Sequence, residues 1–195
     1  TKPISNQLIK GLTKLEYRGY DSAGISGHDI NSKLVTIKAT GPIKNLKNKL
    51  SKLNGITTAV SHTRWATHGQ PTLKNTHPHL SEYIGIVHNG IIENYLDLKS
   101  YLKKKGYVFR SDTDSEVICH LMNYYFNKSA DMQSSIISTA NSLEGSYAIA
   151  AINSHTPHTI YTSCKGSPII LGKGLDANYI SSDITPIIDH TKHFI

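Results

Sequence analysis

The fold class is decided by residues 147–182, which read YAIAAINSHTPHTIYTSCKGSPIILGKGLDANYISS. Short runs with a strand-like composition stand at 147–152, 159–162, 169–171 and 179–182. Each connection between them contains glycine or proline, which are typical turn residues. This pattern predicts an antiparallel meander.

Elsewhere in the chain, helices and strands are expected in separate blocks. Apolar residues at helical spacing predict helices at 6–17, 43–53, 95–105, 116–125 and 132–143. Strand-like runs stand at 23–27, 34–39, 56–62, 83–88 and 107–109, and another begins at 193–195. Asn89–Gly90 gives a turn signal after one of these strands. Segregated blocks favour an α+β fold over a regular βαβ alternation.

The ends of the helices carry capping signals. Ser5 and Asn94 are expected to cap the helices that follow them. Thr113 and Glu116 form the Thr-x-x-Glu pattern of a capping box. Residues 63–79, rich in Thr, Gly, Pro, Asn and His, predict a long irregular segment of the kind that carries function in many proteins.

The composition is that of an ordinary globular protein. With 195 residues, 38% hydrophobic and 18% charged, the chain predicts one domain, or at most two small ones, and excludes disordered and fibrous classes. No apolar run approaches the roughly 18 to 20 residues of a membrane span, and the N-terminal residues lack the apolar core of a signal peptide. We therefore expect a cytoplasmic protein, with Cys119 and Cys164 reduced and buried.

The net charge of +7 comes mostly from dispersed lysines. Their only run, at 103–105, stands where a helix is expected to end, which indicates a solvated helix terminus rather than a phosphate-binding patch. Nucleic-acid binding is therefore not favoured. The three arginines, Arg18, Arg64 and Arg110, stand out because a guanidinium can grip an anion with two parallel hydrogen bonds.

Several catalytic chemistries lack their motifs. Five of the eleven histidines lie between His62 and His88, but His77 and His79 cannot form a helical i, i+4 pair and residues 63–79 contain no carboxylate. We therefore expect no metal site. Serine-nucleophile and phosphate-binding glycine motifs are also missing, so no cofactor is expected.

Five uncommon sequence words remain: LEYRGYDSAG at 15–24, SHTRWATHG at 61–69, NTHPH at 75–79, HNGIIEN at 88–94 and SDTDSE at 111–116. Together they resemble the glutaminase domain of the glucosamine-6-phosphate synthase family, the isomerising glutamine:fructose-6-phosphate aminotransferases. The resemblance covers essentially the whole chain, and its last matching motifs are CKGSP at residues 164–168 and ISSD at residues 180–183. It is specific, because related amidotransferases are similar in the Arg-Gly and Asn-Gly pieces but do not usually carry WATHG, HPH and HNGIIEN together.

The resemblance implies a four-layer αββα sandwich of antiparallel sheets, the N-terminal nucleophile hydrolase fold. In such class II glutamine amidotransferases an N-terminal cysteine attacks the side-chain amide of L-glutamine, and its own α-amine acts as base. The ammonia then converts fructose 6-phosphate to glucosamine 6-phosphate in separate isomerase domains. A homodimer is implied for the full-length protein.

The resemblance also implies roles for individual residues. It gives two oxyanion-hole donors, Asn89 and Gly90, and a group of substrate-binding residues: Arg64 for the α-carboxylate, Asp114 for the ammonium, and Trp65, Thr67 and His68 on a closing loop.

Each of these residues also has a structural interpretation. The Asp114 carboxylate could stabilise a helix N-terminus through the helix dipole, and Asn89–Gly90 is a common turn sequence. Arg64 could form a surface ion pair, and Trp65 could serve only in side-chain packing. For Arg18 and Asp21, a local salt bridge is the preferred interpretation.

The chain differs from the family at its ends. Family members begin with Cys-Gly-Ile in a short strand, which has no counterpart here. Neither cysteine has a terminal amine, and Thr1 leads directly into a helix, so none of them replaces the nucleophile. We expect residues 1–195 to be a type-2 amidotransferase domain incomplete at both ends, without its first strand or isomerase domains, and inactive alone. The alternative is a non-catalytic remnant or binding module that retains a glutamine pocket.

Overall fold

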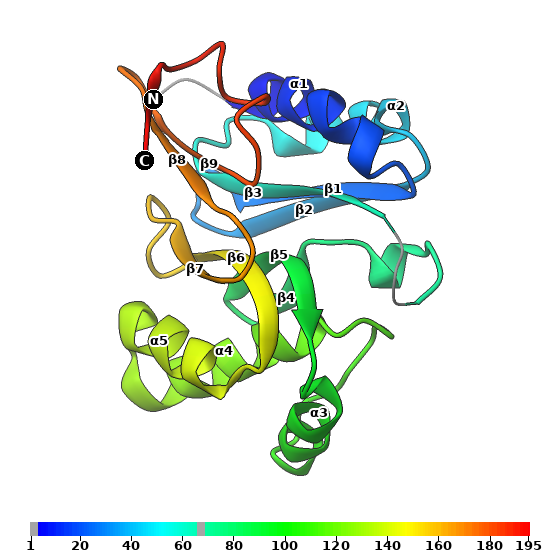
Figure 1. Ribbon diagram of the computed structural model, residues 1–195, viewed down its shortest axis with the longest axis vertical. Coiled ribbons are helices and arrows are strands. Elements are labelled where there is room, and N and C mark those ends of the chain that lie inside the picture. Colours follow the sequence, from blue (N-terminus) through cyan, green and yellow to red (C-terminus); the bar gives the residue numbers. More distant parts are fainter. Residues whose placement is uncertain (1–3, 66–68) are drawn as a thin grey trace.

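The computed structural model describes residues 4–65 and 69–195 (Figure 1). Its α-helices are α1 (Ser5–Leu15), α2 (Ile43–Lys47), α3 (Tyr95–Lys104), α4 (Glu116–Ser129) and α5 (Met132–Ser142). Its strands are β1 (Ser22–His28), β2 (Leu34–Thr40), β3 (Ala59–Arg64), β4 (His79–Ser81), β5 (Ile84–Ile92), β6 (Gly145–Asn153), β7 (Tyr161–Lys165), β8 (Ile170–Lys173), β9 (Asn178–Ser181) and β10 (His193–Phe194). Short 3₁₀ turns occupy Glu16–Arg18, Leu50–Leu53 and Leu73–Asn75.

The strands form three antiparallel sheets, in the orders β2-β1-β3, β4-β5-β6-β7 and β10-β8-β9. The single meander predicted over residues 147–182 is therefore wrong, because β6 and β7 pair in one sheet whereas β8 and β9 pair in another. Figure 1 shows the first two sheets stacked face to face, with α1 and α2 on the outer face of one and α4 and α5 on the outer face of the other. This arrangement confirms the α+β class and the helix–sheet–sheet–helix layering.

Two apolar cores hold these layers together. One lies between α1, α2 and the β1 sheet and contains Leu12, Ile25 and Leu46. The other lies between β5, β6 and the helices α4 and α5 and contains Ile86 and Leu121. Each such side chain contributes about 1.5–3 kcal/mol when buried, so the stripes that predicted the helices also fix which face of each helix meets a sheet.

The turn predicted at Asn89–Gly90 is wrong. Strand β5 continues through both residues, and they pair with Ala148 and Tyr147 of β6. Gly90 is required there because its φ is +131° and a Cβ atom would lie 2.0 Å from the carbonyl oxygen of Ser146. The dipeptide therefore serves a close approach between strands rather than a chain reversal.

The capping predictions hold only in position, and only for Asn94, which is the N-cap residue of α3. Neither Ser5 nor Asn94 caps a helix with its side chain; α1 follows Ile4, and Asn94 instead joins the Ser142 carbonyl to the Glu144 N–H.

No capping box forms at α4 either. The Glu116 carboxylate accepts hydrogen bonds from the backbone N–H groups of Arg110 and Ser111, upstream of the helix. Thr113 uses its hydroxyl to bond Ser111 and His79. The capping groups therefore hold the loop at 110–115 rather than the first turn of the helix.

Three smaller predictions need correction. Residues 107–109 form no strand, since they pair with no other strand; the rings of Tyr107 and Phe109 pack against His120 of α4. The helix predicted at 43–53 breaks into α2 and a 3₁₀ turn. Both cysteines are free, but only Cys119 is buried.

The exposed lysines at 103–105 confirm a solvated end of α3.

Candidate functional site

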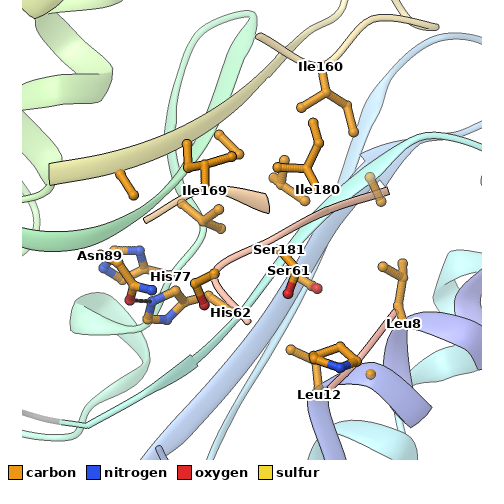
Figure 2. A pocket seen from close by; sticks show the side chains of 18 of the residues that line it. Leu8, Leu12, Ser61, His62, His77, Asn89, Ile160, Ile169, Ile180 and Ser181 are labelled. Carbon is orange, nitrogen blue, oxygen red and sulfur yellow. Dashed lines mark hydrogen bonds between the residues drawn. The ribbon is translucent and has the colours of Figure 1, made fainter. Parts of the chain in front are cut away.

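A cavity of about 890 Å³ lies between α1, β3, β5, β6 and β9. Figure 2 shows its apolar part, where Leu8 and Leu12 of α1 lie across from Ile160, Ile169 and Ile180. Its polar part collects five of the predicted site residues, namely Arg64, Trp65, Asn89, Gly90 and Asp114. Thr67 and His68 lie outside the described residues.

Arg64 is the last residue of β3 and is only 5% exposed. Its guanidinium donates hydrogen bonds to the backbone carbonyls of Gly69 (3.0 Å) and Gln70 (3.4 Å). Burial lowers the pKa of Arg64, and the Asp21 and Asp114 carboxylates oppose that shift. A surface ion pair is therefore excluded for Arg64; it is a buried cation presented to the cavity.

Asp114 is 6% exposed and lies in the loop before α4. Its Oδ2 accepts a hydrogen bond of 2.9 Å from the backbone N–H of Ile92, at the end of β5. Its Oδ1 accepts one of 3.3 Å from the Ser115 hydroxyl. The carboxylate therefore ties the strand of Asn89 to the loop before α4. Asp114 lines the same cavity as Arg64 and is one of the negative charges that act on its guanidinium.

Asn89 and Gly90 are neighbours on β5, and both line the cavity. Oδ1 of Asn89 lies 3.1 Å from Nε2 of His62 on β3. This contact occupies the oxygen end of the carboxamide. A side-chain amide next to a main-chain amide is the usual composition of an oxyanion hole.

Trp65 follows β3 and is 57% exposed, which excludes a core-packing role. Its ring lies 5.7 Å from that of Tyr20. Arg18 was expected to pair with Asp21, but its Nη1 lies 3.5 Å from the Asp183 carboxylate, which joins the first helical segment to the loop after β9.

Four histidines form a connected group beside Asn89: His77, His79 and His88 are buried, and His62 is half-buried. The sequence pattern had suggested only a metal-ligand role for such a group. His62 and His77 stack with ring centroids 4.3 Å apart, and His79 meets His77 edge-on. Burial lowers the pKa of His62 to about 4, of His79 to about 3 and of His88 to about 4. Within residues 4–65 and 69–195, no cluster of three or more His, Cys, Asp or Glu could hold a metal ion. These rings are neutral packing and hydrogen-bonding groups.

Asn75 is a second residue that sequence interpretation missed. Its fully buried carboxamide donates to the Gln70 carbonyl (3.0 Å) and accepts from the Asp112 backbone N–H (2.9 Å). It therefore braces the loop that holds Arg64 against the loop that carries Asp114. Its position in the NTHPH word was the only available signal.

Neither cysteine is among the residues that line the cavity. The Cys119 thiol contacts the carbonyls of His79 and Ile84, and burial raises its pKa. Cys164 lies exposed on β7. Across the described part of the chain, no helix has the length and apolarity needed to cross a membrane.

Comparisons with known sequences agree with the motifs. Residues 58–164 match the family described as glutamine amidotransferase domain. Proteins called glutamine–fructose-6-phosphate aminotransferase (isomerizing) from Buchnera aphidicola subsp. Acyrthosiphon pisum and Clostridium acetobutylicum are each 44% identical to this chain over 98% of its length. The match covers 32% and 31% of those proteins, so the chain spans about a third of their length.

Solved structures share the fold. A glutamine phosphoribosylpyrophosphate amidotransferase from B. subtilis superposes with a TM-score of 0.81 at 26% identity, over 98% of this chain and 42% of that one. A structure described as the allosteric regulatory enzyme of purine biosynthesis gives 0.82 at 26% identity, with the same coverage. These matches confirm the predicted amidotransferase fold and the resemblance carried by the five sequence words.

Proposed function

Because the chain belongs to the glutamine amidotransferase domain family, we propose that it binds L-glutamine in the cavity and is the glutaminase part of a glucosamine-6-phosphate synthase. The observation that carries this proposal is the pair of opposite buried charges, Arg64 and Asp114, on a cavity that also holds the carboxamide of Asn89.

A free amino acid presents a carboxylate and an ammonium on one carbon. Arg64 would bind the carboxylate, since a guanidinium offers parallel donors to two oxygens. Asp114 would bind the ammonium. Both side chains are shielded from water, which strengthens each interaction. Trp65, Thr67 and His68 belong to the segment after β3, which would cover the bound amino acid.

In the proposed reaction, a thiolate adds to the side-chain amide carbon of glutamine. The amide oxygen becomes negative and is held by the Asn89 side chain and the Gly90 N–H. Ammonia leaves when the intermediate collapses to a thioester, and water then releases glutamate. The α-amine of the N-terminal cysteine that supplies this thiolate accepts the thiol proton and delivers it to the leaving ammonia.

The nucleophile would come from a segment preceding Ile4, since neither Cys119 nor Cys164 lines the cavity. Strands β3 and β9 are the end strands of their two sheets, and both line the cavity. An added strand between them would join the two sheets through main-chain hydrogen bonds. Ile4, the first described residue, itself lines the cavity.

The rest of the proposed activity lies outside residues 1–195. The ammonia would convert fructose 6-phosphate to glucosamine 6-phosphate in isomerase domains that this stretch does not include, as the name of the relatives suggests. We place this biosynthetic protein in the cytoplasm, as a homodimer in its full-length form. Its two free cysteines agree with a reducing compartment.

The second candidate is a non-catalytic module that binds glutamine. It is favoured by the same observation about the cysteines, because the described chain itself presents no thiol to the cavity.

Mass spectrometry of the protein made in its native host separates the two candidates. A mature chain that begins with cysteine and releases glutamate from glutamine supports the enzyme. A chain that begins at Thr1 and binds glutamine without hydrolysing it supports the binding module.

A further inference from the structure

The orientation of the Asn89 carboxamide decides whether it can stabilise an oxyanion. Only its nitrogen end donates hydrogen bonds, and its oxygen end would repel a negative charge. The two orientations have nearly the same shape, so packing alone does not choose between them. A hydrogen-bond partner is needed to fix the rotation.

His62 is in position to be that partner. Its Nε2 lies 3.1 Å from Oδ1 of Asn89, and Figure 2 shows this contact at the polar end of the cavity. The two residues come from different sheets, His62 from β3 and Asn89 from β5. The contact therefore links the two layers on either side of the cavity.

The protonation of His62 favours this orientation. The ring is neutral at pH 7 because burial lowers its pKa to about 4, so it carries one N–H. Its Nδ1 is buried and has no hydrogen-bond partner among the described residues. A proton on Nε2 points at Oδ1 of Asn89, 3.1 Å away, and this is the His62 donor that the hydrogen-bond geometry supports.

Neighbouring groups hold the His62 ring in place. His77 stacks on it at 4.3 Å with an interplanar angle of 21°. Nδ1 of His77 accepts a hydrogen bond of 3.2 Å from the backbone N–H of His88, the residue before Asn89. Nδ1 of His88 is in turn 2.9 Å from the Ser115 hydroxyl. His77 thus contacts both the His62 ring and the backbone next to Asn89.

We propose that His62 is a positioning residue that holds Asn89 by its oxygen and so directs the amide N–H groups toward the substrate. This inference rests on the proposed glutaminase function. His62 would act through Asn89 and would make no contact with the substrate.

The test uses the full-length protein with its native N-terminus. His62→Phe keeps a ring that can stack on His77 but removes the donor. We expect kcat for glutamine hydrolysis to fall about 10-fold to 10²-fold, less than the 10² to 10³ typical of removing an oxyanion donor outright, with KM changed less than about two-fold. His62→Gln restores an N–H donor and should recover most of the loss. His155→Phe, at an exposed ring that contacts Tyr83 and Phe126, is the matched control and should match the parent.

A double-mutant cycle separates this role from a merely structural one. In an Asn89→Ala background, His62→Phe should change kcat less than about two-fold, because both substitutions remove the same interaction. An equal loss in both backgrounds would overturn the proposal. If the parent itself does not hydrolyse glutamine, the proposed function fails instead, and the positioning role fails with it.

A second measurement does not depend on activity or on a folded variant. The ¹⁵N chemical shifts of the His62 ring in the unsubstituted protein report which nitrogen carries the proton. A proton on Nε2 agrees with the proposal. A neutral ring protonated on Nδ1 would contradict it, because the Asn89 oxygen would then have no donor.

Discussion

The backbone N–H of Ile92 donates a hydrogen bond of 2.9 Å to Oδ2 of Asp114. This contact joins the end of β5, which carries Asn89 and Gly90, to the loop that supplies the acid of the proposed glutamine site. Asp114 thus has a structural partner as well as a proposed ligand. Substitutions at this residue can separate the two.

Asp114→Asn should weaken glutamine binding with little effect on folding. The amide oxygen of asparagine can still accept from Ile92, but the charge that would bind the substrate ammonium is lost. We expect KM for glutamine to rise at least about 10-fold, since a charged hydrogen bond contributes about 1.5–3 kcal/mol. Asp114→Ala is the comparison, and it should lower the melting temperature as well. Steady-state kinetics and thermal unfolding of both variants check this; an unchanged KM in Asp114→Asn would remove the residue from the binding role.

Arg64→Lys should also act mainly on binding. An ammonium cannot make the two parallel bonds that a carboxylate accepts from a guanidinium, nor reach both Gly69 and Gln70 in the same geometry. We expect KM for glutamine to rise about 10-fold or more, with a smaller change in kcat. Glutamine hydrolysis measured over a range of substrate concentrations tests this, and kinetics equal to the parent would exclude Arg64 as the carboxylate ligand.

Gly90→Ala should destabilise the fold strongly. A Cβ atom there would lie 2.0 Å from the Ser146 oxygen, and the φ of +131° is itself unfavourable for alanine. We expect a loss of about 3 kcal/mol or more in the free energy of unfolding. Gly106→Ala is the matched control, because Gly106 also has a positive φ, +90°, but no atom within 4 Å of the added Cβ. Urea unfolding should show a loss near 1 kcal/mol for the control; equal losses would refute the steric argument.

The buried histidines predict that stability falls in mild acid. Burial lowers the pKa of His62 and His88 to about 4, whereas an unfolded histidine titrates near 6.5. The unfolded chain therefore binds protons first, and stability is lost as pH falls from about 6.5 toward 4. Each such histidine adds a slope of up to about 1.4 kcal/mol per pH unit. Urea unfolding at pH 7 and pH 5 measures this loss, and His88→Gln should reduce it; a pH-independent free energy would contradict the burial argument.

Local sequence patterns predicted those helices and strands whose apolar face can be read from residue spacing alone. The spacing of Leu8 and Leu12 gave α1, and the alternating runs gave β6 to β9, because the burial of one face needs no knowledge of the partner. Asn89–Gly90 failed as a turn because pairing with β6, 55 or more residues later in the chain, outweighs local turn preference. The capping box predicted at Glu116 is wrong for a related reason, since the Glu116 carboxylate accepts hydrogen bonds from the backbone of Arg110 and Ser111 instead of capping the helix.

The candidate site was predictable only through resemblance. Arg64 and Asp114 are 50 positions apart, and nothing in their local sequence places them on one cavity. The supporting residues His62 and Asn75 were not identified, because their roles depend on contacts with Asn89 and Asp112 that only the folded chain creates.

The most direct test of the account is isothermal titration of the protein with its native N-terminus, comparing L-glutamine with D-glutamine. Two opposite charges and an amide donor that line one cavity at fixed positions accept only one arrangement of carboxylate, ammonium and side chain about the α-carbon. The account predicts binding of the L-form and at least about 10-fold weaker binding of the D-form, a difference of about 1.4 kcal/mol. Equal affinity for the two forms would contradict the proposed glutamine site.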